Sequence, residues 1–124
     1  MTTIHKTLQG KIALITGGNR NIGRETALSL AAKGADIIIT FREQHESAAQ
    51  TVKDLQAAGV RAAAIQVNLT GTAGLPTFVA AVKAQLAAWG RENFDILVNN
   101  AGTLRIATFD RVTEDDLDTV FATN

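Results

Sequence analysis

Short apolar runs alternate along the chain with longer segments in which apolar residues recur at helical spacing. Residues 11–16 form the first run, which stops at Gly17 and Gly18, a pattern typical of a strand covered on both faces. From residue 22 to 32 apolar positions recur every three to four residues and predict a helix. The isoleucine-rich residues 36–41 predict a second buried strand.

The same unit repeats along the rest of the chain. Gly59 and Gly90 each follow a helical segment, as glycine commonly does. A further helix is expected to start at Thr113, because threonine caps helices well and acidic residues follow it in the first turn. After residue 41 the predicted elements are a helix over 47–58, a strand over 60–69, a helix over 75–89, a strand over 94–99, a loop and this last helix.

Strands that alternate with helices of this length predict an α/β fold with a parallel sheet. Right-handed crossovers then place helices on both faces of the sheet. The chain has 124 residues, of which 46% are hydrophobic, and no linker or low-complexity segment divides it. We therefore expect a single domain over residues 1–124.

The amino-acid composition argues against several classes of binding partner and of catalytic group. Twelve basic and twelve acidic residues give zero formal net charge, so no overall field attracts nucleic acid or an anionic membrane. The N-terminus lacks the apolar segment of a secretory signal, and no run is long enough to span a bilayer, so we expect a cytoplasmic protein. Cysteine and tyrosine are both absent, which excludes thiolate chemistry and a phenolic acid or base within these residues. No pattern of metal ligands is present.

A glycine-rich turn, T-G-G-N-R-N-I-G over residues 16–23, joins the first strand to the first helix. Free backbone amides and the helix dipole at such a turn favour a phosphate group, and glycines allow a diphosphate to approach the backbone. Gly23 would let the helix pack closely on the sheet. The alternative is a turn whose glycines only supply positive φ angles and which binds nothing.

With this turn and the segment N-N-A-G over residues 99–102, the sequence resembles the short-chain dehydrogenases/reductases. Asn21 stands where that family usually has its middle glycine, and asparagine tolerates a left-handed conformation better than most residues. The resemblance covers the whole chain and implies a Rossmann-type doubly wound parallel sheet, with the first four strands in the order 3-2-1-4. In the two motifs it implies that the cofactor is bound by Gly17, Asn19, Arg20, Asn21, Ile22, Gly23, Asn99, Asn100, Ala101 and Gly102.

The end of the second strand bears on the choice between NAD and NADP. Phe41 falls where NAD-preferring relatives carry aspartate, and Arg42 falls where NADP-preferring relatives carry a basic residue. Arg20 matches a second basic position of that group, and arginine pairs bidentately with phosphate. Each arginine taken alone could be a solvated surface residue. Together they favour NADP, with Asn68 and Leu69, at the end of the third strand, expected beside the adenine.

The resemblance further implies hydride transfer between NADP(H) and a carbonyl or secondary alcohol, catalysed by tyrosine, lysine, serine and asparagine. Only the asparagine is matched, by Asn124. The chain is therefore interpreted as the cofactor-binding half of an oxidoreductase, incomplete at its C-terminus, with the fourth strand left as an exposed edge. These 124 residues alone are predicted to be inactive, and the full-length protein is expected to form a homo-oligomer.

Two other classes of protein are alternatives to an oxidoreductase. A non-catalytic dinucleotide-binding module would share the turn and lack the catalytic residues. A receiver-type signalling module would need acidic residues after the first strand, where Gly17 and Gly18 stand instead.

Overall fold

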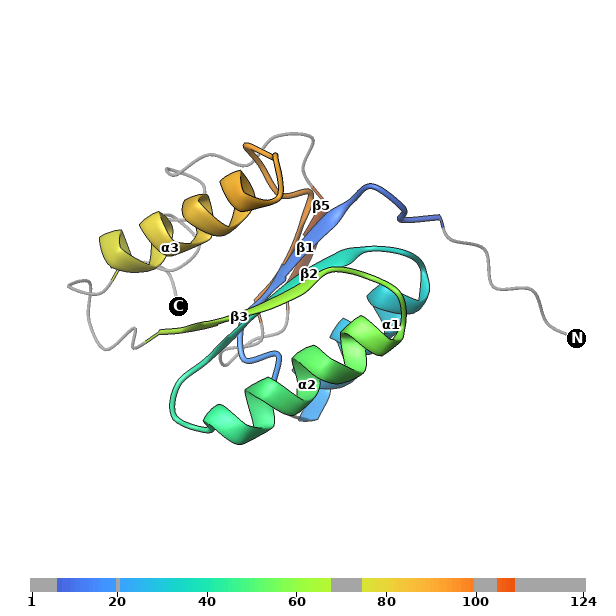
Figure 1. Ribbon diagram of the computed structural model, residues 1–124, viewed down its shortest axis with the longest axis horizontal. Helices are drawn as coiled ribbons and strands as arrows, with labels where there is room; N and C mark the ends of the chain where they lie inside the picture. The colour runs from blue at the N-terminus through green and yellow to red at the C-terminus, as the bar shows by residue number, and fades with distance from the viewer. Residues whose placement is uncertain (1–6, 20, 68–74, 100–104, 109–124) are drawn as a thin grey trace, which may run out of the picture.

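The computed structural model describes residues 7–19, 21–67, 75–99 and 105–108. They form one five-stranded sheet with helices on both of its faces (Figure 1). The elements in chain order are β1 (Ile12–Ile15), α1 (Asn21–Ala32), β2 (Asp36–Phe41), α2 (His45–Ala57), β3 (Ala62–Gln66), α3 (Leu75–Ala88), β4 (Ile96–Asn99) and β5 (Arg105–Thr108).

The strand order is β3-β2-β1-β4-β5, and the first four strands are parallel. Helices α1 and α2 lie together on one face of the sheet, and α3 lies on the other (Figure 1). The chain therefore winds outwards from β1 through β2 to β3, crosses the sheet, and continues at β4. The α/β class, the parallel sheet and the order 3-2-1-4 predicted for the first four strands are confirmed.

Strand β5 corrects the expectation of a loop after β4 and of β4 as an exposed edge. Residues Arg105–Thr108 pair antiparallel with Ile96–Asn99, with Ile96 opposite Thr108 and Asn99 opposite Arg105. A strand edge presents unpaired backbone N–H and C=O groups, and β5 satisfies those of β4. Four residues are too few for a periodic pattern to distinguish such a strand from a loop.

The other predicted boundaries differ by a few residues. The strand predicted over 60–69 is shorter, because Gly59 is in a turn with φ of +94° and regular pairing with β2 begins only at Ala62. The helix predicted from residue 47 begins two residues earlier, at His45. The helix predicted from Thr113 lies outside the described residues.

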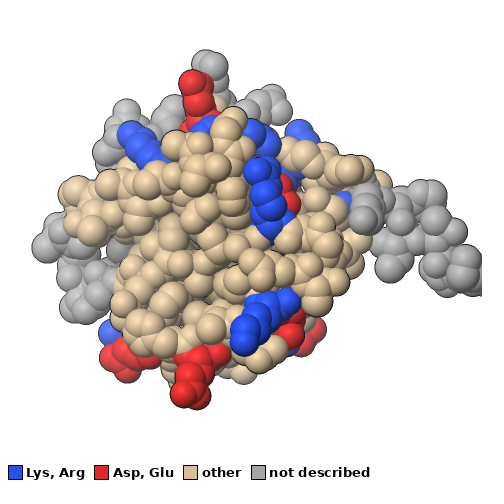
Figure 2. Space-filling view, viewed as in Figure 1, with Lys and Arg blue, Asp and Glu red and all other residues tan. Residues whose placement is uncertain are grey.

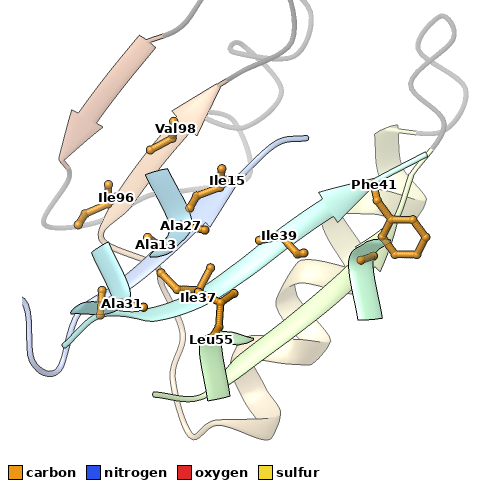
Figure 3. Close-up of a cluster of buried hydrophobic side chains, with 12 residues drawn as sticks. Ala13, Ile15, Ala27, Ala31, Ile37, Ile39, Phe41, Leu55, Ile96 and Val98 are labelled. Atoms are coloured by element: carbon orange, nitrogen blue, oxygen red, sulfur yellow. The ribbon is translucent and has the colours of Figure 1, made fainter. Parts of the chain in front are cut away.

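The core has two parts, one on each face of the sheet. In β1, Ile12 and Leu14 face α3, whereas Ala13 and Ile15 face α1 and α2, as the two-residue period of a strand requires. All four are completely buried. The second part is shown in Figure 3, where Ala27 of α1 packs among side chains of the sheet.

At the amino ends of the strands, a buried carboxylate joins β1 to β4. Asp95 Oδ2 accepts hydrogen bonds from the backbone N–H of Ile12 at 2.9 Å and from Arg91 Nη2 at 3.1 Å. Arg91 also donates to the carbonyl of Gly10 at 2.8 Å. This carboxylate thus fixes the start of both central strands.

A second cluster joins β2, β3 and the end of α3 at the same ends. The guanidinium of Arg61 pairs with Asp36 at 2.9 Å, and its carbon Cζ lies 5.0 Å from the centre of the Trp89 ring. In Figure 2, basic and acidic side chains lie next to each other in several places, with uncharged surface between these groups. Arg61 and Asp36 form one such local pair.

Candidate functional site

The carboxyl ends of β1, β2 and β4 meet where the glycine-rich turn enters α1. β1 is flanked by β2 on one side and β4 on the other. The crossovers that lead to these two strands lie on opposite faces of the sheet (Figure 1). In open α/β sheets such a reversal of winding opens a crevice beyond the carboxyl ends, and ligands bind there. The fold places the turn at this crevice.

The turn depends on two left-handed residues and one close contact. Gly17 has φ of +65°, and Asn21, at the start of α1, has φ of +55°. Among the described non-glycine residues, Asn21 alone has a positive φ. A Cβ atom at Gly18 would lie 2.5 Å from Ile39 Cγ2, so the turn packs directly on β2 and leaves no room for a side chain. The left-handed conformation considered for Asn21 is the one that the structure contains.

Thr40 of β2 holds the two glycines. The amide of Gly17 donates to Thr40 Oγ1 at 3.1 Å, and the amide of Gly18 donates to the Thr40 carbonyl at 3.2 Å. The amide of Thr16 donates to the carbonyl of Val98 in β4 at 3.0 Å. The amides of residues 16–18 therefore bind inside the protein and are not available to a ligand.

In the first turn of helix α1, an exposed apolar residue is followed by a buried glycine. Ile22 is 60% exposed, and Gly23 is buried. Backbone N–H groups in the first turn of a helix have no partner within the helix, and the helix dipole adds partial positive charge there. The start of α1 therefore offers amides and positive potential to an anion.

Asn19 is held by helix α2. Its carbonyl accepts from Ser47 Oγ at 2.5 Å and lies 3.2 Å from Thr51 Oγ1, while its Nδ2 lies 3.4 Å from Ser47 Oγ. Only 8% of its surface is exposed. The predicted cofactor-binding residue Asn19 is thus occupied mainly with contacts inside the protein.

The end of β2 combines an apolar side chain with an exposed arginine. Phe41 is buried and meets the ring of His45 edge to face at a centroid distance of 5.0 Å. Arg42 is exposed, and its carbonyl accepts from Gln66 Nε2 at 2.9 Å. Gln66 Nε2 also lies 3.3 Å from His45 Nε2. The main chain of Arg42 is therefore fixed while its side chain faces solvent.

An ion pair connects the two helices beside the turn. Arg24 Nη2 lies 2.5 Å from Asp54 Oδ2, and Arg24 Nη1 donates to Thr51 Oγ1 at 2.9 Å. The hydrogen bond from Arg24, together with a weaker one from Gln50, lowers the pKa of the Asp54 carboxyl below its ordinary value. Asp54 stays ionised and keeps the guanidinium in contact with Thr51.

The structure brings together the predicted residues of the first two strands and their turns. Gly17, Asn19, Asn21, Ile22, Gly23, Phe41 and Arg42 all lie at or next to the carboxyl ends of β1 and β2. Asn99 ends β4 at the same side, and its backbone alone is described. The predicted residues Arg20, Asn68, Leu69, Asn100, Ala101, Gly102 and Asn124 lie outside the described residues.

Four residues around the turn were not singled out from the sequence: Thr40, Ser47, Thr51 and Gln66. The spacing of Ser47 and Thr51 carried a signal, since residues four apart lie on one face of a helix. Polar Thr40 and Gln66 at the ends of apolar strands carried another.

The described ranges contain neither a candidate metal-ligand group nor a candidate membrane-spanning helix. No group of three or more histidine, cysteine, aspartate or glutamate residues there could hold a metal ion. No helix among those residues is long and apolar enough to cross a membrane.

Comparison with known proteins assigns a family to this arrangement. The chain matches the short-chain dehydrogenase family over residues 11–124. It is 36% identical over 123 residues to the hydroxynaphthalene reductase arp2 of Aspergillus fumigatus, a match that covers 99% of this chain and 43% of the reductase. The chain therefore spans less than half the length of this relative.

Solved structures of similar proteins include complexes with either nicotinamide cofactor. A short-chain dehydrogenase from Burkholderia cenocepacia in complex with NADP is 44% identical, with a TM-score of 0.66 over 90% of this chain and 43% of that one. An NAD⁺-bound xylitol dehydrogenase is 30% identical, with a TM-score of 0.66 over 78% of this chain and 35% of that one. The choice of cofactor must therefore be argued from the residues.

Proposed function

The chain belongs to the short-chain dehydrogenase family, and we propose that its glycine-rich turn and α1 bind the diphosphate of a nicotinamide dinucleotide, with preference for NADP. The observation that carries this proposal is the geometry of the turn. Left-handed Gly17 and Asn21 lead the chain from β1 into α1 at the point where the winding of the sheet reverses. This geometry presents the first amides of α1 to the crevice at the carboxyl ends of the strands.

The described residues fit such a cofactor. The amides of Gly17 and Gly18 are satisfied by Thr40, so the anion would be held by the amides of residues 21–23. Ile22, exposed beside these amides, offers an apolar surface to a ring system. When bound, the nicotinamide supplies or accepts a hydride.

The preference for NADP rests on the end of β2. A carboxylate there would bind the ribose hydroxyls and repel a 2′-phosphate, but the position holds buried, uncharged Phe41. Arg42 follows it with its side chain in solvent, and Gln66 fixes its main chain. A guanidinium pairs with a phosphate through two parallel hydrogen bonds. Arg42 is therefore proposed to bind the 2′-phosphate.

For the whole protein we propose hydride transfer between NADP(H) and a carbonyl or secondary alcohol, in a cytoplasmic homo-oligomer. Residues 1–124 contain no tyrosine, so we assign them cofactor binding and no proton transfer. A second candidate, a dinucleotide-binding module without catalysis, is supported by the same geometry of the glycine-rich turn. Assaying the natural protein with NADPH and a panel of ketones separates the two, since the module would bind NADPH without oxidising it.

The cofactor preference is tested with Arg42→Ala in the natural protein, by titration with NADPH and NADH. Loss of a charge-assisted pair costs roughly 1.5–3 kcal/mol, so NADPH should bind more weakly by about one to two orders of magnitude while NADH changes little. Lys53→Ala, which removes an exposed cation from α2, is the control and should leave both affinities unchanged. Equal losses for NADPH and NADH in Arg42→Ala would contradict a 2′-phosphate contact.

A further inference from the structure

One carbonyl oxygen of the glycine-rich turn is held by hydroxyl groups of the neighbouring helix. Ser47 and Thr51, on successive turns of α2, both direct their hydroxyls at the carbonyl of Asn19, at 2.5 and 3.2 Å. Thr51 is completely buried. We call Ser47, Thr51 and the carbonyl of Asn19 the hydroxyl clasp.

The position of Thr51 in the clasp is fixed from two sides. Its Oγ1 lies 2.9 Å from the carbonyl of Ser47, in the preceding turn of α2. The same oxygen accepts from Arg24 Nη1 at 2.9 Å, and Asp54 pairs with that guanidinium. Thr51 Oγ1 therefore accepts from Arg24, and its single hydroxyl proton is shared between the carbonyl oxygens of Ser47 and Asn19.

The direction of the Asn19 carbonyl matters to an anion at the start of α1. A carbonyl oxygen carries partial negative charge and would repel a diphosphate if it turned toward one. Thr40 already fixes the amides of Gly17 and Gly18. The clasp fixes the carbonyl of Asn19, the residue that follows them in the turn. It keeps this oxygen hydrogen-bonded to side chains of α2.

We propose that Ser47 and Thr51 are positioning residues for cofactor binding, which hold the turn in the conformation that leaves the amides of α1 available to a diphosphate. The inference rests on the proposed function. Because the diphosphate is common to both nicotinamide dinucleotides, the clasp should contribute equally to NADPH and NADH. This distinguishes it from Arg42, whose proposed partner is present in NADPH alone.

The test uses the natural protein with Ser47→Ala, Thr51→Val and both together, against the conservative variants Ser47→Thr and Thr51→Ser. The double variant should bind NADPH and NADH about tenfold more weakly, by the same factor for each. Thr51→Ser keeps the hydroxyl and should bind nearly as the unaltered protein does. Should the double variant fail to fold, Ser47→Ala, at a half-exposed position, takes its place. This variant should weaken the binding of NADPH and NADH equally, by a smaller factor than the double variant.

A control separates positioning from general loss of stability. Arg61→Ala removes the contacts with Asp36 and Trp89 at the opposite ends of the strands, so it should lower the melting temperature without changing either affinity. Unchanged affinities in the double variant would overturn the clasp, and a loss confined to NADPH would overturn it too by assigning Ser47 to the 2′-phosphate instead. Failure of the unaltered protein to bind either dinucleotide would overturn the proposed function and this inference with it.

Discussion

Asn21 shows how one residue adapts to a position that the family fills with glycine. An L-residue in the left-handed region crowds its Cβ against the backbone, and asparagine is among the residues that tolerate this best. Its φ of +55° shows that the turn keeps the left-handed conformation despite the side chain. The substitution therefore preserves the backbone path into α1.

At this position we expect the type of side chain to affect stability more than its size. Asn21→Ala should destabilise the protein by about 1–2 kcal/mol, because alanine carries a Cβ into the left-handed region without the local hydrogen bonding of asparagine. Asn21→Gly should stay within about 1 kcal/mol, and its dinucleotide affinity should change less than tenfold. Urea unfolding and cofactor titration measure these quantities.

Glu25→Ala, at an exposed position within α1, is the matched control and should leave stability nearly unchanged. A tenfold gain in affinity for Asn21→Gly would mean that the side chain obstructs the diphosphate.

At the scale of elements, α1 and α2 are joined beside the site by Arg24 and Asp54. The pKa of Asp54 is lowered by the hydrogen bond from Arg24, so the folded state favours the ionised carboxylate. Such a group stabilises the fold above the pKa of the unfolded chain, about 3.9 for aspartate, and this contribution is lost as the pH falls through the lowered folded value.

The pH dependence can be measured as the difference in unfolding free energy between the unaltered protein and Asp54→Asn. The difference should be constant above about pH 5 and shrink as the solution is acidified below pH 4. A difference that grows on acidification would contradict the lowered pKa of Asp54.

The hydrophobic pattern of the sequence predicted helices and strands well where they are continuously buried, and less well at the edge of the sheet. The run DIIITF was placed at its observed bounds, because a strand buried on both faces reads as an unbroken apolar segment. β5 was missed because a four-residue edge strand depends on a partner distant in the chain. The glycine-rich turn was identified from its glycines, whereas the roles of Thr40, Ser47 and Thr51 depend on α2 and β2 lying beside it in the fold.

At the scale of the whole molecule, Asp95 connects the strand β1, from which the chain winds to β2 and β3, with β4 on the other side of β1. Its carboxylate, with 9% side-chain exposure, binds the first residue of β1 and the guanidinium of Arg91. β1 and β4 are neighbours in the sheet but 83 residues separate Ile12 from Asp95. This contact therefore closes the longest loop among the hydrogen bonds described above.

Asp95→Ala should cost about 2–3 kcal/mol in unfolding free energy, because it leaves a buried backbone N–H without its acceptor. Asp95→Asn keeps an acceptor oxygen for Ile12 and should cost less. Chemical denaturation of both variants gives the comparison. Equal costs would show that the charge toward Arg91, and not the bond to Ile12, is what stabilises the sheet.

The stacking of Arg61 on Trp89 has a practical consequence for fluorescence. Trp89 is the only tryptophan of the 124 residues, and its indole lies under a guanidinium at the amino ends of the strands. The proposed ligand site is at the carboxyl ends, so the emission of this indole reports on whether the β2, β3 and α3 region is intact. Subtracting the spectrum of Trp89→Phe isolates that emission, which gives an optical record of unfolding at the ends of the strands opposite the crevice.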